Sequence, residues 1–210
     1  MDIQLKHLAT DYPTLLPAIQ RAIGIGCQET TKVVSAYHMN KLTQSRKGYI
    51  NWTLTEPIID NAIVELGIEE ISIRRSPNRN NSSFHLEVHT PYAVIVFAQV
   101  SKGGSVPRKA IYRQIYIDQC CMWEWKTDVK PFTENCRPLY VITYALPKGA
   151  NSMPEIYIGR LNSSQDAWSC NHPISAVLSE TTMAKQNEER ATVALSEDIT
   201  KATNIRFKNA

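Results

Sequence analysis

Residues 83–101 read SFHLEVHTPYAVIVFAQVS, and this stretch carries the strongest β signal in the chain. In its first half three apolar residues alternate with three polar ones, the period of a strand with one buried face: Phe84, Leu86 and Val88 against His85, Glu87 and His89. Thr90-Pro91 supplies a turn, and the run YAVIVFAQV that follows is apolar on both faces. The stretch therefore predicts a hairpin whose second strand lies inside a sheet.

The spacing of apolar residues before this hairpin predicts helices. Residues 12–24 and 28–46 fit two helices, and Gly24 and Gly26 are expected to end the first of them. A third helix is expected to begin with Thr55 as its N-cap and Pro57 in its first turn, with Gly67 just past its end. A short strand is then expected at residues 69–75.

After the hairpin, residues 107–118 fit either a helix started by Pro107 or a strand rich in Ile and Tyr, and a helix is slightly favoured. Residues 139–146 and 155–161 predict two strands joined by a long connection. Residues 176–198 predict a surface helix. The order of elements predicts an α+β fold, in which N-terminal helices precede a mainly antiparallel sheet with at least one packed helix.

We expect one domain over residues 1–178, with a helical part at 1–67 and a sheet part at 68–178. A polar C-terminal helix or tail is expected at 179–210. The 210 residues are 43% hydrophobic and 20% charged, which is typical of a globular protein. No apolar stretch approaches the roughly 20 residues that cross a bilayer, and the first residues lack the apolar segment of a secretory signal. These features predict a soluble, cytoplasmic protein without a membrane partner.

Positive charge is concentrated in one part of the chain. The whole chain has a net charge of +3, whereas residues 71–117 hold seven basic side chains and one acidic one, a net charge of +6. The seven are Arg74, Arg75, Arg79, Lys102, Arg108, Lys109 and Arg113. If the connection after the hairpin crosses the sheet, these cations line one face and attract phosphates. The segment then predicts binding to DNA or RNA.

Three tyrosines of this region, Tyr92, Tyr112 and Tyr116, are candidates for stacking on bases. An alternative arrangement places the two groups of cations at opposite ends of one sheet edge. In that case the basic segment is a solvated surface balanced by the acidic remainder of the protein. A further alternative is a module that binds a protein partner through an exposed strand or its tryptophans.

The spacing His85-x-Glu87-x-His89 places two imidazoles and a carboxylate on one face of a strand. Neighbouring pairs among these side chains could bind one metal ion. The two histidines, however, are about 13 Å apart along a regular strand. The alternative is the polar outer face of a half-buried strand, so His85, Glu87 and His89 remain weak candidates and no metal site is assigned.

The order helix, three strands, helix and strand resembles the core of PD-(D/E)xK nucleases. This resemblance implies Mg²⁺ as the cofactor and a carboxylate, an acidic or amide residue and a lysine as the catalytic set. The candidates here are Glu87, Gln99 and Lys102. The diagnostic Asp is missing, and Gln99-x-x-Lys102 puts the two side chains on opposite faces of a regular strand. Whether the protein is an enzyme is left open by these residues.

Overall fold

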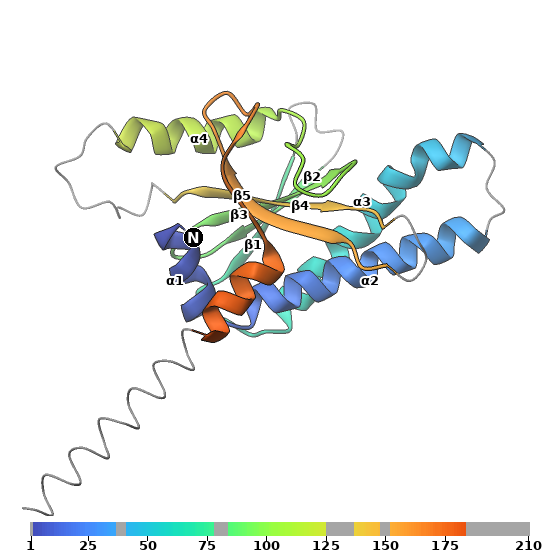
Figure 1. The fold of residues 1–210 in the computed structure, drawn as a ribbon, viewed down its shortest axis with the longest axis horizontal. Coiled ribbons are helices and arrows are strands. Elements are labelled where there is room, and N and C mark those ends of the chain that lie inside the picture. Colours follow the sequence, from blue (N-terminus) through green and yellow to red (C-terminus); the bar gives the residue numbers. More distant parts are fainter. Residues whose placement is uncertain (1, 37–40, 78–83, 125–136, 148–151, 184–210) are drawn as a thin grey trace, which may run out of the picture.

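A computed structural model describes residues 2–36, 41–77, 84–124, 137–147 and 152–183 of the chain. Within these ranges three helices precede a six-stranded sheet, a fourth helix connects the third strand to the fourth, and a fifth helix follows the last strand (Figure 1). The predicted α+β class is confirmed, with helices before a mostly antiparallel sheet. None of the described helices combines the length and the apolar character needed to cross a bilayer.

The first two helices are α1 (Ile3–Asp11) and α2 (Leu15–Ala36). The first was not predicted; it begins at the N-cap Asp2, whose side chain accepts a hydrogen bond from the Gln4 amide at 2.9 Å. The second runs through Gly24 and Gly26, so the predicted break between two helices is wrong. A Cβ atom on Gly26 would lie 2.3 Å from Oγ1 of Thr55, which means that Gly26 allows another helix to approach closely.

That other helix is α3 (Lys41–Val64), and it continues through Thr55 and Pro57. The predicted helix start at Thr55 is therefore wrong. The physical reason is a buried stripe that repeats every four residues on both sides of Thr55 and packs toward α2: Asn51, Thr55, Ile59 and Ile63. Gly67 adopts a φ of 62°, in agreement with its expected place just past the helix end.

The sheet contains β1 (Ser72–Pro77), β2 (Phe84–His89), β3 (Val94–Val100), β4 (Leu139–Ala145), β5 (Glu155–Leu161) and β6 (Trp168–Pro173), in that spatial order. Neighbouring strands pair antiparallel, except that β3 and β4 are parallel. Helix α4 (Ile111–Glu124) makes the connection between these two. The two predicted hairpins are confirmed, and β6 was not predicted. The helix favoured for residues 107–118 is confirmed from Ile111 onward, but Pro107 does not start it.

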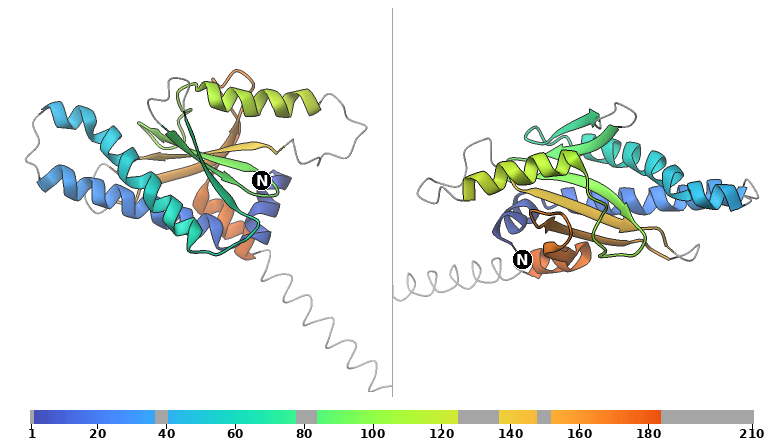
Figure 2. Two further views of the ribbon diagram at one scale, coloured as in Figure 1. Left: turned by 180° about the vertical axis from the view of Figure 1, so that it is seen from behind. Right: turned by 90° about the horizontal axis from the view of Figure 1, so that it is seen from above.

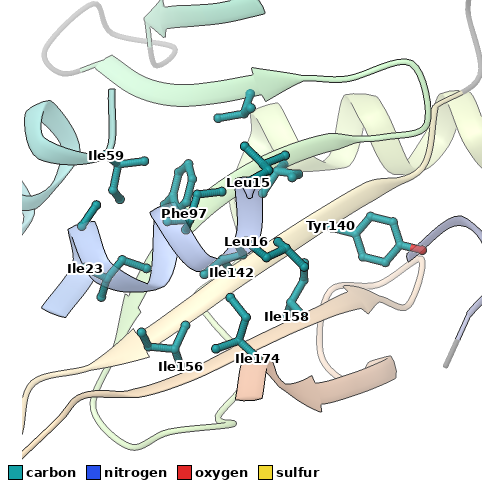
Figure 3. Packing of buried hydrophobic residues seen from close by; sticks show 14 of the residues in the cluster. Leu15, Leu16, Ile23, Ile59, Phe97, Tyr140, Ile142, Ile156, Ile158 and Ile174 are labelled. Atoms are coloured by element: carbon teal, nitrogen blue, oxygen red, sulfur yellow. The ribbon is translucent and has the colours of Figure 1, made fainter. Parts of the chain in front are cut away.

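Helices cover both faces of the sheet (Figures 1 and 2). The larger core lies between one face and the helices α1, α2, α3 and residues 174–183; it includes Leu15, Leu16, Ile23, Ile59, Ile142 and Ile158 (Figure 3). A smaller core between the other face and α4 includes Val94, Val96, Ile117 and Val141. Successive residues of β3 enter the two cores alternately, as expected of a central strand.

The last described helix begins at residue 174, two residues earlier than predicted. It packs on the larger core through Ile174 and Val177 and is thus more than a surface helix. Of the predicted span, residues 184–198 lie outside the described residues.

Candidate functional site

A buried carboxylate on β2 is the centre of the candidate site. His85, Glu87 and His89 share the face of the sheet that is turned toward α4, as the alternation of the strand predicted. Nε2 of His85 lies 2.8 Å from Oε1 of Glu87, and Nε2 of His89 lies 3.0 Å from Oε2. The hydroxyl of Tyr116 on α4 donates to Oε2 at 2.9 Å. We call these four residues the Glu87 cluster.

The pKa of Glu87 is lowered although this residue is only 2% exposed. Burial acts to raise its pKa, but the hydrogen bonds from His85, His89 and Tyr116 outweigh that effect and hold the pKa of Glu87 well below its usual range. Burial and the bond to Glu87 raise the pKa of Tyr116, so its phenol stays protonated and remains a donor. Glu87 therefore contributes a buried negative charge to the cluster at neutral pH.

Two tyrosines one helical turn apart hold the imidazole rings in place. The ring of Tyr112 stacks on His85 with 3.6 Å between centroids, and the ring of Tyr116 meets His89 edge-on at 6.4 Å. These tyrosines therefore face the histidines, although the sequence suggested them as stacking surfaces for bases. Tyr92, the third such candidate, stacks on His7 and donates a hydrogen bond to Asp11.

The geometry of the Glu87 cluster bears on the weak metal candidates His85, Glu87 and His89. Nε2 of each histidine forms a hydrogen bond with the carboxylate. These two nitrogens and both carboxylate oxygens are therefore engaged with one another. Among the described residues, no three His, Cys, Asp or Glu side chains are arranged to hold a metal ion.

Next to the cluster, β2 and β3 separate and form a fork. The two strands pair only between residues 87–89 and 94–96. Beyond that point, residues 84–86 of β2 remain paired with β1, and residues 97–100 of β3 remain paired with β4. A pocket of about 570 Å³ occupies this opening and continues between α3 and α4; it is lined by Trp52, Glu56, Pro77, Phe84, His85, Phe97, Ala110, Ile111, Tyr112 and Ile115. We call it the fork pocket.

Glu56 of α3 brings a second carboxyl group into the fork pocket. Nε1 of Trp52, one turn earlier in the helix, donates to Glu56 Oε1 at 2.7 Å. Burial raises the pKa of Glu56, even though hydrogen bonds from Trp52 and the Leu86 amide and the charge of His85 act in the opposite direction. Two carboxyl groups thus lie near His85, and their pKa values shift in opposite directions. The pKa of Glu87 is lowered, and that of Glu56 is raised.

Sequence reasoning did not identify Glu56 as part of a site. It lies on a helix that packs on the other face of the sheet, and only the gap between β2 and β3 lets it approach His85. A possible sequence signal is the pair Trp52 and Glu56, which are one helical turn apart and can hydrogen-bond within the helix.

The seven predicted phosphate contacts do not line one face. Arg74 and Arg75 are exposed but adjacent on β1, so their side chains leave opposite faces of the sheet. Arg75 pairs with Asp60 of α3, while Arg74 pairs in register with Glu87. Arg79 lies outside the described residues.

Arg113 departs furthest from the expected arrangement, because it is 4% exposed. It donates to the Arg108 carbonyl and, at 3.3 Å, to Oε1 of Gln165, and its guanidinium packs over the Tyr112 ring. These contacts fix the start of α4 against the turn between β5 and β6. Arg113 is therefore a structural residue and does not belong to an exposed basic surface.

Lys102, Arg108 and Lys109 are exposed in the connection between β3 and α4. The strand directions bring this connection to the end of the sheet where β1 also ends. Because β1 and β3 both run antiparallel to β2, the end of β1 and the end of β3 lie at the same end of the sheet, the one where β2 begins. Pro77 at the end of β1 and Ala110 before α4 accordingly line the same pocket.

The candidate nuclease residues are not brought together. Glu87 faces α4, whereas the Gln99 side chain lies on the opposite face, where its amide would be 3.4 Å from a Cβ atom on Gly48 of α3. Lys102 is exposed in the turn after β3. The order of elements that carried the resemblance to PD-(D/E)xK nucleases is present, but its catalytic set is not assembled from Glu87, Gln99 and Lys102.

Comparison of the chain with protein-family models, with curated proteins and with solved structures gave no match.

Proposed function

We propose that the protein binds nucleic acid, DNA or RNA, at the end of the sheet where the fork pocket opens. One observation carries this proposal. Lys102, Arg108 and Lys109 are exposed in the connection that ends at Ala110 of the fork pocket, and none of them forms an ion pair with a residue that the structure describes. Exposed cations of this kind attract phosphates through long-range steering and the release of counterions, and the charge of Lys109 also acts on the Asp166 carboxylate.

The lining of the pocket favours an unpaired base as the group that enters it. Trp52 and Phe84 contribute aromatic rings, and Phe84 is 53% exposed, whereas the Tyr112 ring is already stacked on His85. Stacking of a base on an aromatic ring contributes about 1–3 kcal/mol and tolerates all four bases. We therefore expect a single strand whose backbone contacts the cations while one base occupies the pocket.

The test is binding of a fluorescent single-stranded oligonucleotide measured by anisotropy over a range of salt concentrations. The variant Lys102→Glu/Arg108→Glu/Lys109→Glu should lower the affinity at least about tenfold at low salt. The slope of log K against log salt should become shallower by about 2, since each phosphate contact contributes roughly 0.7 for a single strand. Unchanged affinity and slope would rule out this surface.

A charge-matched control separates a local effect from a change in overall charge. The variant Lys6→Glu/Arg21→Glu/Lys32→Glu reverses three exposed cations of α1 and α2, which lie on the other face of the sheet from α4 (Figure 1). It changes the net charge by the same amount and should retain most of the affinity. An equal loss in both variants would show that binding has no preference for the connection between β3 and α4.

A further inference from the structure

The fork pocket contains a pair of proton-transfer groups that the binding proposal does not use. Of the described residues that line it, only Glu56, His85 and Tyr112 can exchange a proton. Burial raises the pKa of Tyr112, so this phenol stays neutral. A carboxyl group from α3 and an imidazole from β2 thus remain as an acid–base pair facing one pocket.

The His85 ring is oriented by a neighbouring carboxylate, an arrangement that is common for imidazoles that transfer protons. A buried carboxylate, Glu87, binds its Nε2 at 2.8 Å, and the Tyr112 ring stacks on it at 3.6 Å. A carboxylate on one ring nitrogen fixes the orientation of the ring. Because Nε2 is bound to Glu87, Nδ1 is the remaining ring nitrogen of His85, a residue that lines the pocket.

We propose that the fork pocket cleaves RNA by acid–base catalysis, with Glu56 and His85 as the catalytic residues and Glu87 as a positioning residue. This inference rests on the proposed binding of nucleic acid and restricts the substrate to RNA. RNA carries its own nucleophile, the 2′-hydroxyl, so a carboxylate and an imidazolium are sufficient to move the protons.

The reaction balances without a further reactant. Glu56 takes the proton of the 2′-hydroxyl, and the 2′-oxygen forms a bond to the adjacent phosphorus. The bond from phosphorus to the 5′-oxygen breaks, and protonated His85 donates its proton to that oxygen. The products are a 2′,3′-cyclic phosphate and a 5′-hydroxyl end, after which proton exchange with water restores both groups. The raised pKa of Glu56 supports its role as the base, because bases work best with a pKa near the working pH.

The test compares a fluorescent single-stranded RNA with its 2′-O-methyl analogue in the presence of excess EDTA. We expect cleavage of the RNA to products with cyclic phosphate ends, and no cleavage of the analogue. His85→Ala and Glu56→Gln should each lower the rate at least about 100-fold, in the range of general acid–base catalysis, while the RNA still binds. Added imidazole should restore part of the rate of His85→Ala.

Matched controls use residues outside the pocket. His172 of β6 and the exposed Glu69 do not line it, so His172→Ala and Glu69→Gln should cleave at the wild-type rate. Thermal unfolding of each variant shows whether it is folded. If His85→Ala is unfolded, Glu56→Gln decides, because it replaces a half-buried carboxyl group with an amide of the same shape.

The outcomes separate this inference from the proposed function. RNA that binds but stays intact overturns the cleavage proposal and leaves the binding proposal standing. Absence of binding overturns both. Cleavage that requires Mg²⁺ or Mn²⁺ and persists in His85→Ala overturns the acid–base assignment and favours a metal-dependent nuclease. Cleavage that is equally fast in all variants and controls identifies a contaminating ribonuclease and also overturns the proposal.

Discussion

Tyr116 of α4 donates a hydrogen bond to the buried carboxylate of Glu87 on β2, with 2.9 Å between the two oxygens. This bond fastens the helix that connects β3 to β4 onto a strand that is not adjacent to it in sequence. The same carboxylate orients His85 beside the fork pocket. One buried carboxylate therefore contributes both to the attachment of α4 and to the orientation of that imidazole.

Removing the phenolic hydroxyl should weaken this attachment. We expect Tyr116→Phe to lower the free energy of unfolding by about 2 kcal/mol, because a hydrogen bond to a buried charged group is stronger than a neutral one. Urea denaturation measures the change. Tyr49→Phe is the control, since Tyr49 is 68% exposed and its loss of a hydroxyl should be neutral. Equal effects would show that the bond to Glu87 contributes nothing specific.

The stability contributed by Glu87 should depend on pH. Its pKa in the folded protein is lowered, so the stabilisation is fully present above the unfolded value of about 4.3 and decreases as the pH falls through the folded value. We expect Glu87→Gln to cost about 3 kcal/mol near neutral pH, as when one partner of a buried charge pair is removed. The difference from wild type in urea denaturation should shrink at acidic pH. A difference that is constant with pH would contradict this account.

Two glycines of α2 provide a test of the contact between α2 and α3. A Cβ atom on Gly26 would lie 2.8 Å from the Cα atom of Thr55, so Gly26→Ala must push the helices apart. We expect a loss of about 2 kcal/mol, as for other overpacked cores. Gly24→Ala has only ordinary contact with Met153, at 3.5 Å, and alanine favours a helix. Thermal unfolding should therefore show a lower midpoint for Gly26→Ala and an equal or higher midpoint for Gly24→Ala.

Cys27 should be unreactive in the folded protein. It is fully buried, and burial raises the pKa of its thiol to about 11, so little thiolate exists near pH 8. We expect iodoacetamide to leave Cys27 unmodified under native conditions and to modify it in concentrated guanidinium chloride. Mass spectrometry of the digested protein measures both states. Rapid native labelling of Cys27 would contradict its position in the core.

Arg113 should be required for stability, in contrast to its neighbour Arg108. Lysine cannot reproduce the bonds from the Arg113 guanidinium to Gln165 and to the Arg108 carbonyl, so Arg113→Lys should cost about 2 kcal/mol. Arg108→Lys keeps an exposed charge and should be neutral. Urea denaturation distinguishes the two. If Arg113→Lys is as stable as wild type, its burial has no structural role.

The hairpin formed by β2 and β3 was predictable because its two strands follow local patterns. Alternation along Phe84–His89 fixes which side chains share a face, and a run that is apolar on both faces marks a central strand. Strand β6 is harder to recognise, since its sequence WSCNHP is short and its apolar–polar alternation covers only Trp168 to Asn171. It lies at the edge of the sheet, where one side of the strand has no neighbour and little apolar alternation is needed.

The errors in the helices come from contacts that local patterns do not contain. Gly26 looks like a helix end until the position of Thr55 on another helix is known. In the candidate site, too, one part follows from a local pattern and another part from a tertiary contact. The common face of His85, Glu87 and His89 follows from strand geometry, whereas Glu56 joins His85 only because β2 and β3 separate. The burial of Arg113 likewise depends on Gln165, which is 52 residues away in the sequence.

The pair of helices α2 and α3 extends past the sheet at one end (Figure 1). The last buried residue of α2 is Thr30, which bonds Asn51 of α3 at 2.9 Å; beyond this pair the described side chains at 31–36 and 46–50 are only partly buried or exposed. Apart from the approach of Gln99 on β3 to Gly48, this tip is held mainly by the packing of one helix on the other. Its amide protons should exchange with deuterium through local fraying, well before those near the Glu87 cluster, which require opening of the sheet.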